Sequence, residues 1–594
     1  MSVRPKVDKL EKSDELLLGK AEAILQKTFG YPHFREGQDR VILSLLKGQD
    51  SLVVMPTGQG KSLCYQIPAL MQEGLTLVVS PLIALMKDQT DSLRARNYPA
   101  RALNSQTPQA EIQAIFSGIY QNRLKLLFIA PERLQNEGFL SDMRQAKISL
   151  VAVDEAHCIS EWGYDFRPSY QQIASQLKLI YPKTRPVMLA LTATATEEIL
   201  KDIAKSLALK NPFIYIGGFE RASLSLSVFQ LENKREKVLQ ILKAVPGAAI
   251  IYTMSRKLAE ELSVFLKRSG ISALCYHAGL GDAVRSRIQD DFFRNRCRVI
   301  CATNAFGMGI NKADVRAVIH LNIPETLEAY FQEAGRAGRD GRRSYATLLY
   351  SPADIERRRY LFENAHPDKK EVAACYEAIF QKCFKTGREV VRFEQESLCG
   401  EISKRTGEKI LLYKLGTILG VLERHQILSH LKSDEENESL EVFLDRHDMQ
   451  QWVFRQDDEL EVLVFEQILR TFGETCFRRK MPFQLARFCE KGMLDEKEVL
   501  RVFRGWQAAR LIDFQTKNTL LIKLLCTDGK PENLPIDWKV MEKRRKIAER
   551  KLAQMLQYVQ YEKCRRNFIL DYFGETRYTE TCGICDNCTG RHAR

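Results

Sequence analysis

The chain has 594 residues, of which 45% are hydrophobic and 28% are charged, and its formal net charge is +14. This balance excludes a largely disordered chain, and the length exceeds what one hydrophobic core usually supports, so we expect several domains. The excess of Lys and Arg favours a polyanionic partner, nucleic acid first, while a generally basic surface remains the alternative.

The amino-terminal stretch MSVRPKVDKLEKSDELLLGK carries charges throughout and lacks the apolar core of a secretory signal. No apolar run approaches the roughly 18 residues that a membrane span needs. We therefore expect no membrane anchor and a cytoplasmic location, with nucleoid association if the source is bacterial. Most of the 15 cysteines stand singly in apolar surroundings, which is typical of buried thiols in a reducing compartment.

Short apolar runs alternate with amphipathic stretches through the first part of the chain. The runs DSLVVMPT, LTLVVSPL, LKLLFIAPE, ISLVAVDE and PVMLALTAT predict a parallel α/β lobe over residues 1–215. The pattern restarts with AAIIYTMS, ALCYHAG, RVICATN and AVIHLNIP, which predict a second lobe over residues 216–352. The predicted fold class is therefore α/β, with two parallel-sheet lobes in sequence.

The stretch MPTGQGKS at 55–62 follows an apolar strand and is typical of a phosphate-binding loop. Its glycines let backbone N–H groups surround phosphate oxygens, Lys61 would bind the β and γ phosphates, and Ser62 could ligate Mg²⁺. The candidate nucleotide-binding residues are Thr57, Gly58, Gln59, Gly60, Lys61 and Ser62. Met55 replaces the first glycine of the strict pattern, so a structural glycine turn remains an alternative.

A second motif, the acidic stretch DEAH at 154–157, directly follows the apolar run SLVAV. Asp154 is predicted to hold Mg²⁺, and Glu155 to position or deprotonate the attacking water. An exposed acidic strand end is the alternative. The presence of both motifs in one lobe favours ATP hydrolysis.

The second lobe ends in QEAGRAGRDG at 332–341, where Arg336 and Arg339 lie three residues apart on an expected helix and could share a face. Such arginines can neutralise charge on the γ-phosphate in the transition state, from a site divided between two lobes. A solvated basic turn is the alternative reading.

Beyond the second lobe the strand signals fade into helical, charge-rich sequence broken by the acidic loop KSDEENES. Helical stretches followed by ILSHLKS with SLEVFLD, and by LIDFQ with TLLIKLL, predict winged-helix-like domains over 353–450 and 451–530. The second is expected to carry a hairpin that turns near Lys517 and Asn518. A purely scaffolding helical domain remains the alternative.

Residues 531–594 combine an expected long basic helix, VMEKRRKIAERKLAQMLQYVQYEKC, with the cluster TCGICDNC at 581–588. Cys564 offers a fourth thiolate beside Cys582, Cys585 and Cys588, and four sulfurs suit tetrahedral Zn²⁺. The same spacing also occurs in iron–sulfur ligation, which stays open. This segment is too small to have much hydrophobic core of its own. A bound metal can therefore supply its folding free energy.

Seven motifs in order carry a resemblance to a known family: FGYPHFREGQ, MPTGQGKS, SPLIALMKDQ, DEAHCISEWGYDFRPSY, LTATAT, CATNAFGMGINKADVR and QEAGRAGRDG. The set, with CRRNFILDYFGE and CGICDNC, resembles the bacterial-type RecQ family of superfamily 2 DNA helicases. The resemblance implies two RecA-like motor lobes and a zinc-binding module. It also implies that Tyr31, Arg35 and Gln38 bind the adenine end of ATP. The catalytic set that it implies is Lys61, Asp154, Glu155, Gln332, Arg336 and Arg339.

The resemblance further implies an ATP-dependent enzyme, with Mg²⁺ and Zn²⁺, that moves 3′ to 5′ on single-stranded DNA and unwinds duplex or branched DNA in repair and recombination. An RNA-remodelling superfamily 2 ATPase and a nucleotide-switched DNA-binding regulator are the alternatives. Protein partners, such as single-strand-binding or recombination proteins, cannot be read from the sequence.

The stretch SEWGYDFRPSY corresponds to an aromatic loop that senses single-stranded DNA in the family, so Trp162, Phe166 and Arg167 are candidate DNA contacts. A packed aromatic cluster is the alternative, and Tyr164 stands where the family commonly has histidine. The chain departs from the common layout because the winged-helix-like regions precede the cysteines, and we expect no carboxy-terminal HRDC domain after them.

Overall fold

The computed structural model describes residues 11–590, apart from 57, 82, 105–106, 161–166, 308–311, 431–437, 457, 516–518, 527–529 and 576–578. The chain divides into two compact units, one comprising Met1–Arg358 with Lys546–Arg594 and the other Arg359–Arg545. Helix α14 (Pro352–Ala365) leaves the first unit and α22 (Trp538–Val559) returns to it, so the second unit is an insertion in the first. Among the described residues, no helix has the length and apolar character that crossing a membrane would require.

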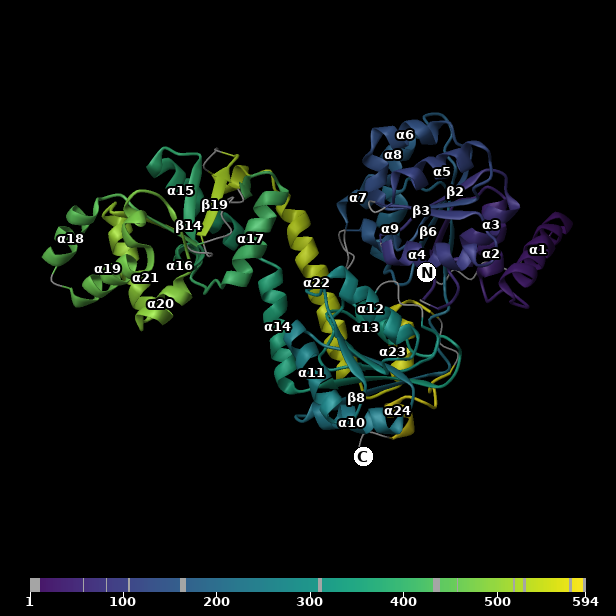
Figure 1. Ribbon diagram of the computed structural model, residues 1–594. Coiled ribbons are helices and arrows are strands. Elements are labelled where there is room, and N and C mark those ends of the chain that lie inside the picture. Colours follow the sequence, from purple (N-terminus) through teal and green to yellow (C-terminus); the bar gives the residue numbers. More distant parts are fainter. Residues whose placement is uncertain are drawn as a thin grey trace. The chain divides into compact units, whose positions relative to one another are not determined.

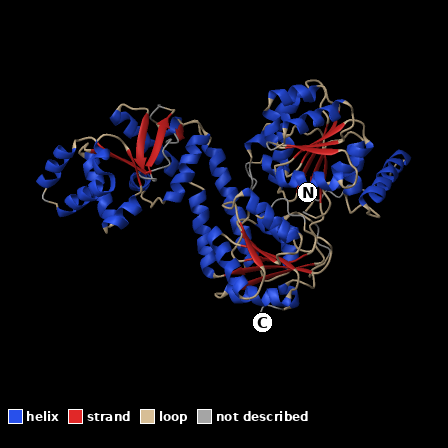
Figure 2. Cartoon of the chain, in the orientation of Figure 1, coloured by secondary structure: helices blue, strands red, loops and turns tan. Residues whose placement is uncertain are grey.

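The first lobe is built on a seven-stranded parallel sheet with the order β3-β4-β2-β5-β6-β1-β7. Its strands are β1 (Ser51–Val54), β2 (Leu75–Val79), β3 (Ala100–Leu103), β4 (Leu126–Ile129), β5 (Ile148–Val153), β6 (Val187–Thr192) and β7 (Phe213–Ile216). Its helices are α1 (Lys12–Ile24), α2 (Gln38–Leu46), α3 (Leu63–Met71), α4 (Ile83–Arg94), α5 (Gln109–Tyr120), α6 (Glu137–Arg144), α7 (Pro168–Gln171), α8 (Ile173–Ile180) and α9 (Glu197–Ser206). The central strands are continuous apolar runs because helices cover both faces of the sheet (Figure 2).

The second lobe has a six-stranded parallel sheet with the order β10-β11-β9-β12-β13-β8. Its strands are β8 (Leu224–Gln230), β9 (Ala248–Tyr252), β10 (Ala273–Tyr276), β11 (Val299–Ala302), β12 (Val315–His320) and β13 (Ser344–Tyr350). Its helices are α10 (Lys234–Ala244), α11 (Arg256–Arg268), α12 (Asp282–Phe293) and α13 (Leu327–Ala334). The two sheets confirm the predicted pair of parallel α/β lobes.

The inserted unit contains two small sheets, ordered β14-β19-β15 and β17-β16-β18. Their strands are β14 (Val390–Glu394), β15 (Leu428–His430), β16 (Glu438–Val442), β17 (Met481–Phe483), β18 (Ile512–Gln515) and β19 (Thr519–Leu524). The helices are α15 (Lys369–Thr386), α16 (Gln395–Thr406), α17 (Leu412–Arg424), α18 (Arg446–Arg455), α19 (Glu459–Phe472), α20 (Leu485–Gly492) and α21 (Glu496–Ala508).

The strand pairing in this unit corrects both predicted pairs of neighbouring strands. β15 and β16 lie in different sheets, and so do β18 and β19, although each pair is adjacent in sequence. The reason is that the partners belong to different cores: Ile522 of β19 packs with Leu428, whereas Phe514 of β18 packs with Trp506. The predicted turn at Lys517 and Asn518 lies outside the described residues.

The terminal segment of the chain packs on β8 of the second lobe, through α23 (Arg565–Tyr572) and α24 (Asp586–Thr589), as Figure 1 shows in yellow beside teal. Asp586 lies at the centre of the contact, since its carboxylate accepts hydrogen bonds from Arg565 Nε at 2.6 Å and from the backbone N of Val228 at 2.8 Å. The ring of Phe573 stacks on Phe219 with the centroids 4.4 Å apart. The segment is therefore part of the body of the second lobe.

Replacing Asp586 with alanine should lower the free energy of unfolding by about 3–5 kcal/mol, because it leaves the charge of buried Arg565 without its carboxylate. Urea denaturation followed by circular dichroism would measure the loss. The matched control is Asp282→Ala, which removes an ion pair to Arg285 from a side chain that is 81% exposed and should cost less than about 1 kcal/mol. Equal losses in the two variants would contradict this account of the contact.

Candidate active site and metal centre

A cleft of about 590 Å³ gathers side chains from both lobes. The predicted residues that line it are Tyr31, Arg35, Gln38, Gly58, Gly60, Lys61, Ser62, Asp154 and Glu155 from the first lobe, and Gln332, Arg336 and Arg339 from the second. Gln59 instead points its amide toward the segment between the lobes, where its Nε2 donates to the carbonyl of Gly218 at 3.2 Å. Thr57 lies outside the described residues.

The loop after β1 has the geometry of a phosphate cradle. Gly58 and Gly60 have φ values of 88° and 80°, in the left-handed region that favours glycine. A Cβ on Gly60 would come within 2.6 Å of Gln38 Nε2, so the close approach also excludes larger residues. Lys61 Nζ is buried and has no hydrogen-bond partner among the described residues. A buried ammonium beside a glycine loop fits the phosphates of a nucleotide, which would supply its missing acceptors.

Two of the residues that are expected to bind the adenine end of ATP form hydrogen bonds with this loop. Gln38 Nε2 donates to the carbonyls of Gln59 at 2.8 Å and Gly60 at 3.1 Å. Arg35 Nη1 donates to the carbonyl of Gly58, and the backbone N of Arg35 donates to Gln38 Oε1 at 3.0 Å. Arg35 and Gln38 therefore hold the shape of the phosphate loop in addition to lining the cleft.

The two acids of the DEAH motif have pKa values that are shifted in opposite directions. Burial and the neighbouring charge of Glu155 raise the pKa of Asp154 to about 6, against the attraction of Lys61. Burial also acts to raise the pKa of Glu155, but Lys61, His157 and Arg336 lower it below its usual value. Glu155 is thus held ionised, as a residue that accepts a proton from water must be.

The LTATAT motif supports the acid pair, a role that the sequence did not indicate. His157 Nδ1 lies 2.9 Å from Thr192 Oγ1, and Thr192 in turn donates to the carbonyl of Thr194 at 3.0 Å. On the other side, the hydroxyl of buried Tyr170 donates to the carbonyl of Asp154 at 3.1 Å. The only sequence signal was that the polar threonines follow the apolar strand β6.

The prediction that Arg336 and Arg339 lie on a helix is wrong. Helix α13 ends at Ala334, and Arg336 and Arg339 lie in the turn that follows. A helix could not continue as far as Arg339 in any case, because Gly338 has φ 62°, in the left-handed region. Both arginines still line the cleft, and Arg336 is only 4% exposed. Burial and the charge of Arg336 lower the pKa of Arg339 to about 9. The turn therefore concentrates positive charge opposite the phosphate loop.

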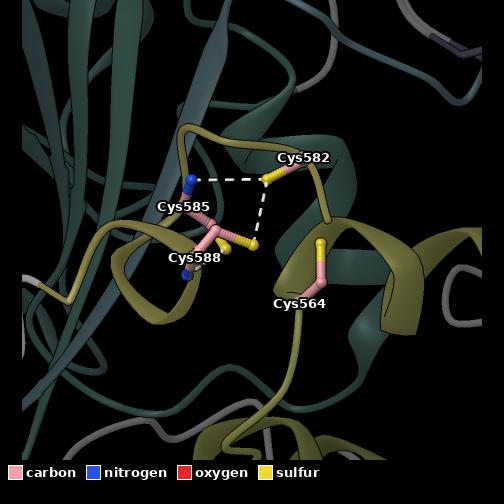
Figure 3. A group of neighbouring side chains, drawn as sticks. All are labelled: Cys564, Cys582, Cys585 and Cys588. Atoms are coloured by element: carbon pink, nitrogen blue, oxygen red, sulfur yellow. Dashed lines mark hydrogen bonds between the residues drawn. The ribbon is translucent and has the colours of Figure 1, made fainter. Parts of the chain in front are cut away.

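The four predicted cysteines form a cluster, with Cys564 before α23 and the other three around α24 (Figure 3). Their Sγ atoms all lie within 4.8 Å of one another, and those of Cys582 and Cys588 are 3.9 Å apart. The backbone N–H groups of Cys585 and Cys588 donate to Cys582 Sγ and Cys585 Sγ at 3.3 Å and 3.4 Å. Tetrahedral Zn–S bonds of about 2.3 Å place sulfurs about 3.8 Å apart, so the cluster fits zinc.

The candidate DNA contacts are less defined. Trp162 and Phe166 lie outside the described residues, as does Tyr164. Arg167 is half-buried at the start of α7, and its Nη1 donates to the carbonyl of Pro81 at 2.9 Å. In this structure, therefore, at least part of the Arg167 guanidinium is engaged by the backbone of the first lobe.

Three sequence families match the chain: "DEAD/DEAH box helicase" over residues 35–203, "Helicase conserved C-terminal domain" over 233–341 and "RecQ zinc-binding" over 520–589. The first two cover the two lobes. The third covers β19, α22 and the cysteine cluster, which agrees with the metal ligands chosen from the sequence.

Curated relatives extend the similarity. The chain is 47% identical over 335 residues to the ATP-dependent DNA helicase RecQ of Haemophilus influenzae, across 56% of this chain and 54% of that protein. It is 44% identical over 357 residues to the protein of the same name from Bacillus subtilis, across 60% of each. The probable ATP-dependent DNA helicase RecS of Bacillus subtilis is 42% identical over 359 residues, across 60% of this chain and 71% of that protein.

The chain thus spans little more than half the length of the first relative and three-fifths of the second, but more than two-thirds of the third. The two helicase families together match both lobes, and the zinc-binding family matches the segment that contains the four terminal cysteines. The two lobes, the divided cleft and the cysteine cluster agree with it, and the chain belongs to the RecQ family of helicases.

Proposed function

We propose that this protein is an ATP-dependent DNA helicase that moves 3′ to 5′ on single-stranded DNA and unwinds duplex or branched DNA. The observation that carries the proposal is the single cleft, which joins a phosphate loop and an acid pair from one lobe with two arginines from the other. The similarity to relatives from Haemophilus influenzae and Bacillus subtilis that are named ATP-dependent DNA helicases supports the choice of DNA.

In the proposed reaction, Lys61 and the N–H groups of the glycine loop bind the phosphates of ATP. Ser62 and Asp154 would hold Mg²⁺, which when bound neutralises charge on the phosphates. Glu155, held ionised, accepts a proton from the attacking water. Arg336 and Arg339 stabilise the charge that develops on the γ-phosphate.

The division of the site between lobes supplies the coupling to movement. ATP contacts groups of both lobes only when the lobes are close, so nucleotide binds the closed arrangement preferentially. Hydrolysis removes that preference, and repeated closing and opening moves the lobes along a bound strand. We further propose that Trp162 and Phe166 stack on unpaired bases and that Arg167 contacts a phosphate.

Strand displacement with ATP on 3′-tailed, 5′-tailed and blunt duplexes tests the proposal. We expect rapid displacement of the 3′-tailed substrate alone. Stimulation of ATP hydrolysis by single-stranded DNA, compared with RNA of the same sequence, tests the choice of nucleic acid, because the 2′-OH is the group that differs. Greater stimulation by RNA would favour an RNA-remodelling ATPase, and ATP binding without hydrolysis would favour a nucleotide-switched regulator.

We also propose one structural Zn²⁺ per chain at Cys564, Cys582, Cys585 and Cys588, with all four positions filled by protein thiolates. Cys585→Ser should lose that zinc and make the terminal segment sensitive to protease, because the metal ties the segment together. Metal analysis of purified protein and limited proteolysis would measure both effects. Cys275→Ser, at a half-buried cysteine outside the cluster, is the matched control and should keep its zinc. Iron in place of zinc would refute the assignment.

A further inference from the structure

The segment between the two lobes, residues 217–222, carries an arginine whose side chain reaches the turn that holds the arginine pair. Arg221 Nη1 donates to the carbonyl of Gly335 at 3.1 Å. Its Nη2 donates to the carbonyls of Ala337 at 2.8 Å and Gly338 at 3.2 Å. The accepting carbonyls stand on both sides of Arg336 and directly before Arg339. One guanidinium therefore spans the backbone that carries both arginines.

This turn depends on contacts from outside itself. The carbonyls at the end of a helix have no partners within the helix, and this helix ends at Ala334. The guanidinium of Arg221 supplies N–H donors for the carbonyls of this turn. Because the guanidinium is planar, the directions of its N–H groups are fixed relative to one another, whereas those of a lysine ammonium are not. Arg221 therefore fixes the backbone of Arg336 and Arg339 together with Val315, whose carbonyl accepts a hydrogen bond from the backbone N of Gly338 at 2.9 Å.

That segment is itself held from two directions. On one side, the backbone N of Phe219 donates to Glu575 Oε2 at 2.8 Å, and the carbonyl of Arg221 accepts from Arg566 Nη2 at 3.2 Å. On the other side, Gln59 Nε2 of the phosphate loop donates to the carbonyl of Gly218 at 3.2 Å. A single short segment thus connects the cysteine-bearing terminal segment, the phosphate loop and the turn that carries the arginines.

We propose that Arg221 is a positioning residue for ATP hydrolysis, which fixes the turn bearing Arg336 and Arg339 against the phosphate loop. The proposal rests on the proposed ATPase function. Arg221 is a positioning residue rather than a catalytic one, because its guanidinium donates to the backbone carbonyls of the turn and it is not among the described residues that line the cleft. It should act on the transition state, where the arginines are needed, and leave nucleotide binding intact.

The test compares Arg221→Lys and Arg221→Ala. Lysine keeps the positive charge but cannot span three carbonyls. If only the charge of Arg221 matters, the lysine variant keeps its kcat, whereas if the geometry of the hydrogen bonds matters, its kcat falls. We expect kcat for ATP hydrolysis to fall about tenfold for lysine and about a hundredfold for alanine, because displaced catalytic groups lose rate steeply. The KM for ATP and the affinity for ADP should stay within about twofold, while the affinity for ADP with aluminium fluoride should fall in parallel with kcat.

Arg298→Lys is the matched control. Its guanidinium also bonds backbone carbonyls of the second lobe, those of Gly247 at 3.1 Å and Val245 at 3.0 Å, but it is not among the described residues that line the cleft. It should leave kcat within about twofold. Any general loss from breaking the hydrogen bonds of a half-buried arginine to backbone carbonyls would appear in this variant as well.

Full kcat in Arg221→Lys, or a loss of kcat matched by an equal loss of ADP affinity and thermal stability, would overturn the proposal. If Arg221→Ala does not fold, the lysine variant decides. Lys61→Ala, measured in the same assay, separates this inference from its premise. If Lys61→Ala still hydrolyses ATP, the ATPase assignment fails, whereas loss in Lys61→Ala with no loss in Arg221→Lys removes only the positioning role.

Discussion

Replacing Lys61 with alanine should reduce steady-state ATP hydrolysis by about a thousandfold and abolish strand displacement. The ammonium is buried at the glycine loop without a hydrogen-bond partner among the described residues, which is the basis for the proposal that it binds phosphate oxygens. Its positive charge also lowers the pKa of Glu155, so its loss would raise that pKa and leave the proposed base ionised less often. Binding of single-stranded DNA should stay within about tenfold, because the change removes a catalytic part and no DNA contact.

Phosphate release and gel-based strand displacement measure the two activities, and fluorescence anisotropy measures DNA binding. Lys201→Ala on α9 is the matched control, since its side chain is 74% exposed and forms an ion pair with Glu197 in the preceding turn of the same helix. It should retain full activity. Undiminished unwinding by Lys61→Ala would remove the motor assignment.

Arg336→Ala should lower the rate of ATP hydrolysis by about a thousandfold or more, the range typical of arginine fingers, while the affinity for ADP changes little. Arg336 is 4% exposed and lines the cleft from the second lobe, so its guanidinium can approach the nucleotide without competing water. A lysine at this position keeps the charge but not the planar fork and should restore only part of the rate.

Single-turnover hydrolysis at saturating ATP isolates the chemical step for this variant. The matched control is Arg268→Ala, which removes an exposed arginine at the end of α11 in the same lobe. An Arg336→Ala variant with normal hydrolysis but weak ATP binding would show that the residue only helps to bind the nucleotide.

The convergence of the candidate site residues on one cleft could be predicted from sequence because they lie near strand ends. Lys61 and Asp154 follow apolar runs, and the carboxyl ends of parallel strands meet at one edge of a sheet, so distant motifs converge there. The spacing of Cys582, Cys585 and Cys588 similarly identifies a metal cluster, because ligand spacing within one short turn is a local property.

Non-local contacts could not be predicted in this way. The helix expected at Arg336 ends at Ala334, and the left-handed backbone of Gly338 prevents a helix from reaching Arg339. A glycine in the sequence permits that backbone but does not reveal it. The strands of the inserted unit pair across long stretches of chain, which neighbouring β-rich sequence does not reveal. Arg221 has no signal at all, since a lone arginine in a connecting segment gives no indication of which carbonyls it will meet.

The packing of the terminal segment on β8 has a consequence for synthesis of the protein. β8 is the edge strand of its sheet, and the backbone N of its Val228 is paired with Asp586, which is 358 residues further along the chain. At translation rates of about 5–20 residues per second, that strand waits tens of seconds on the ribosome before its covering arrives. An uncovered edge strand can pair with other chains, so the nascent second lobe is exposed to unwanted strand pairing during this interval.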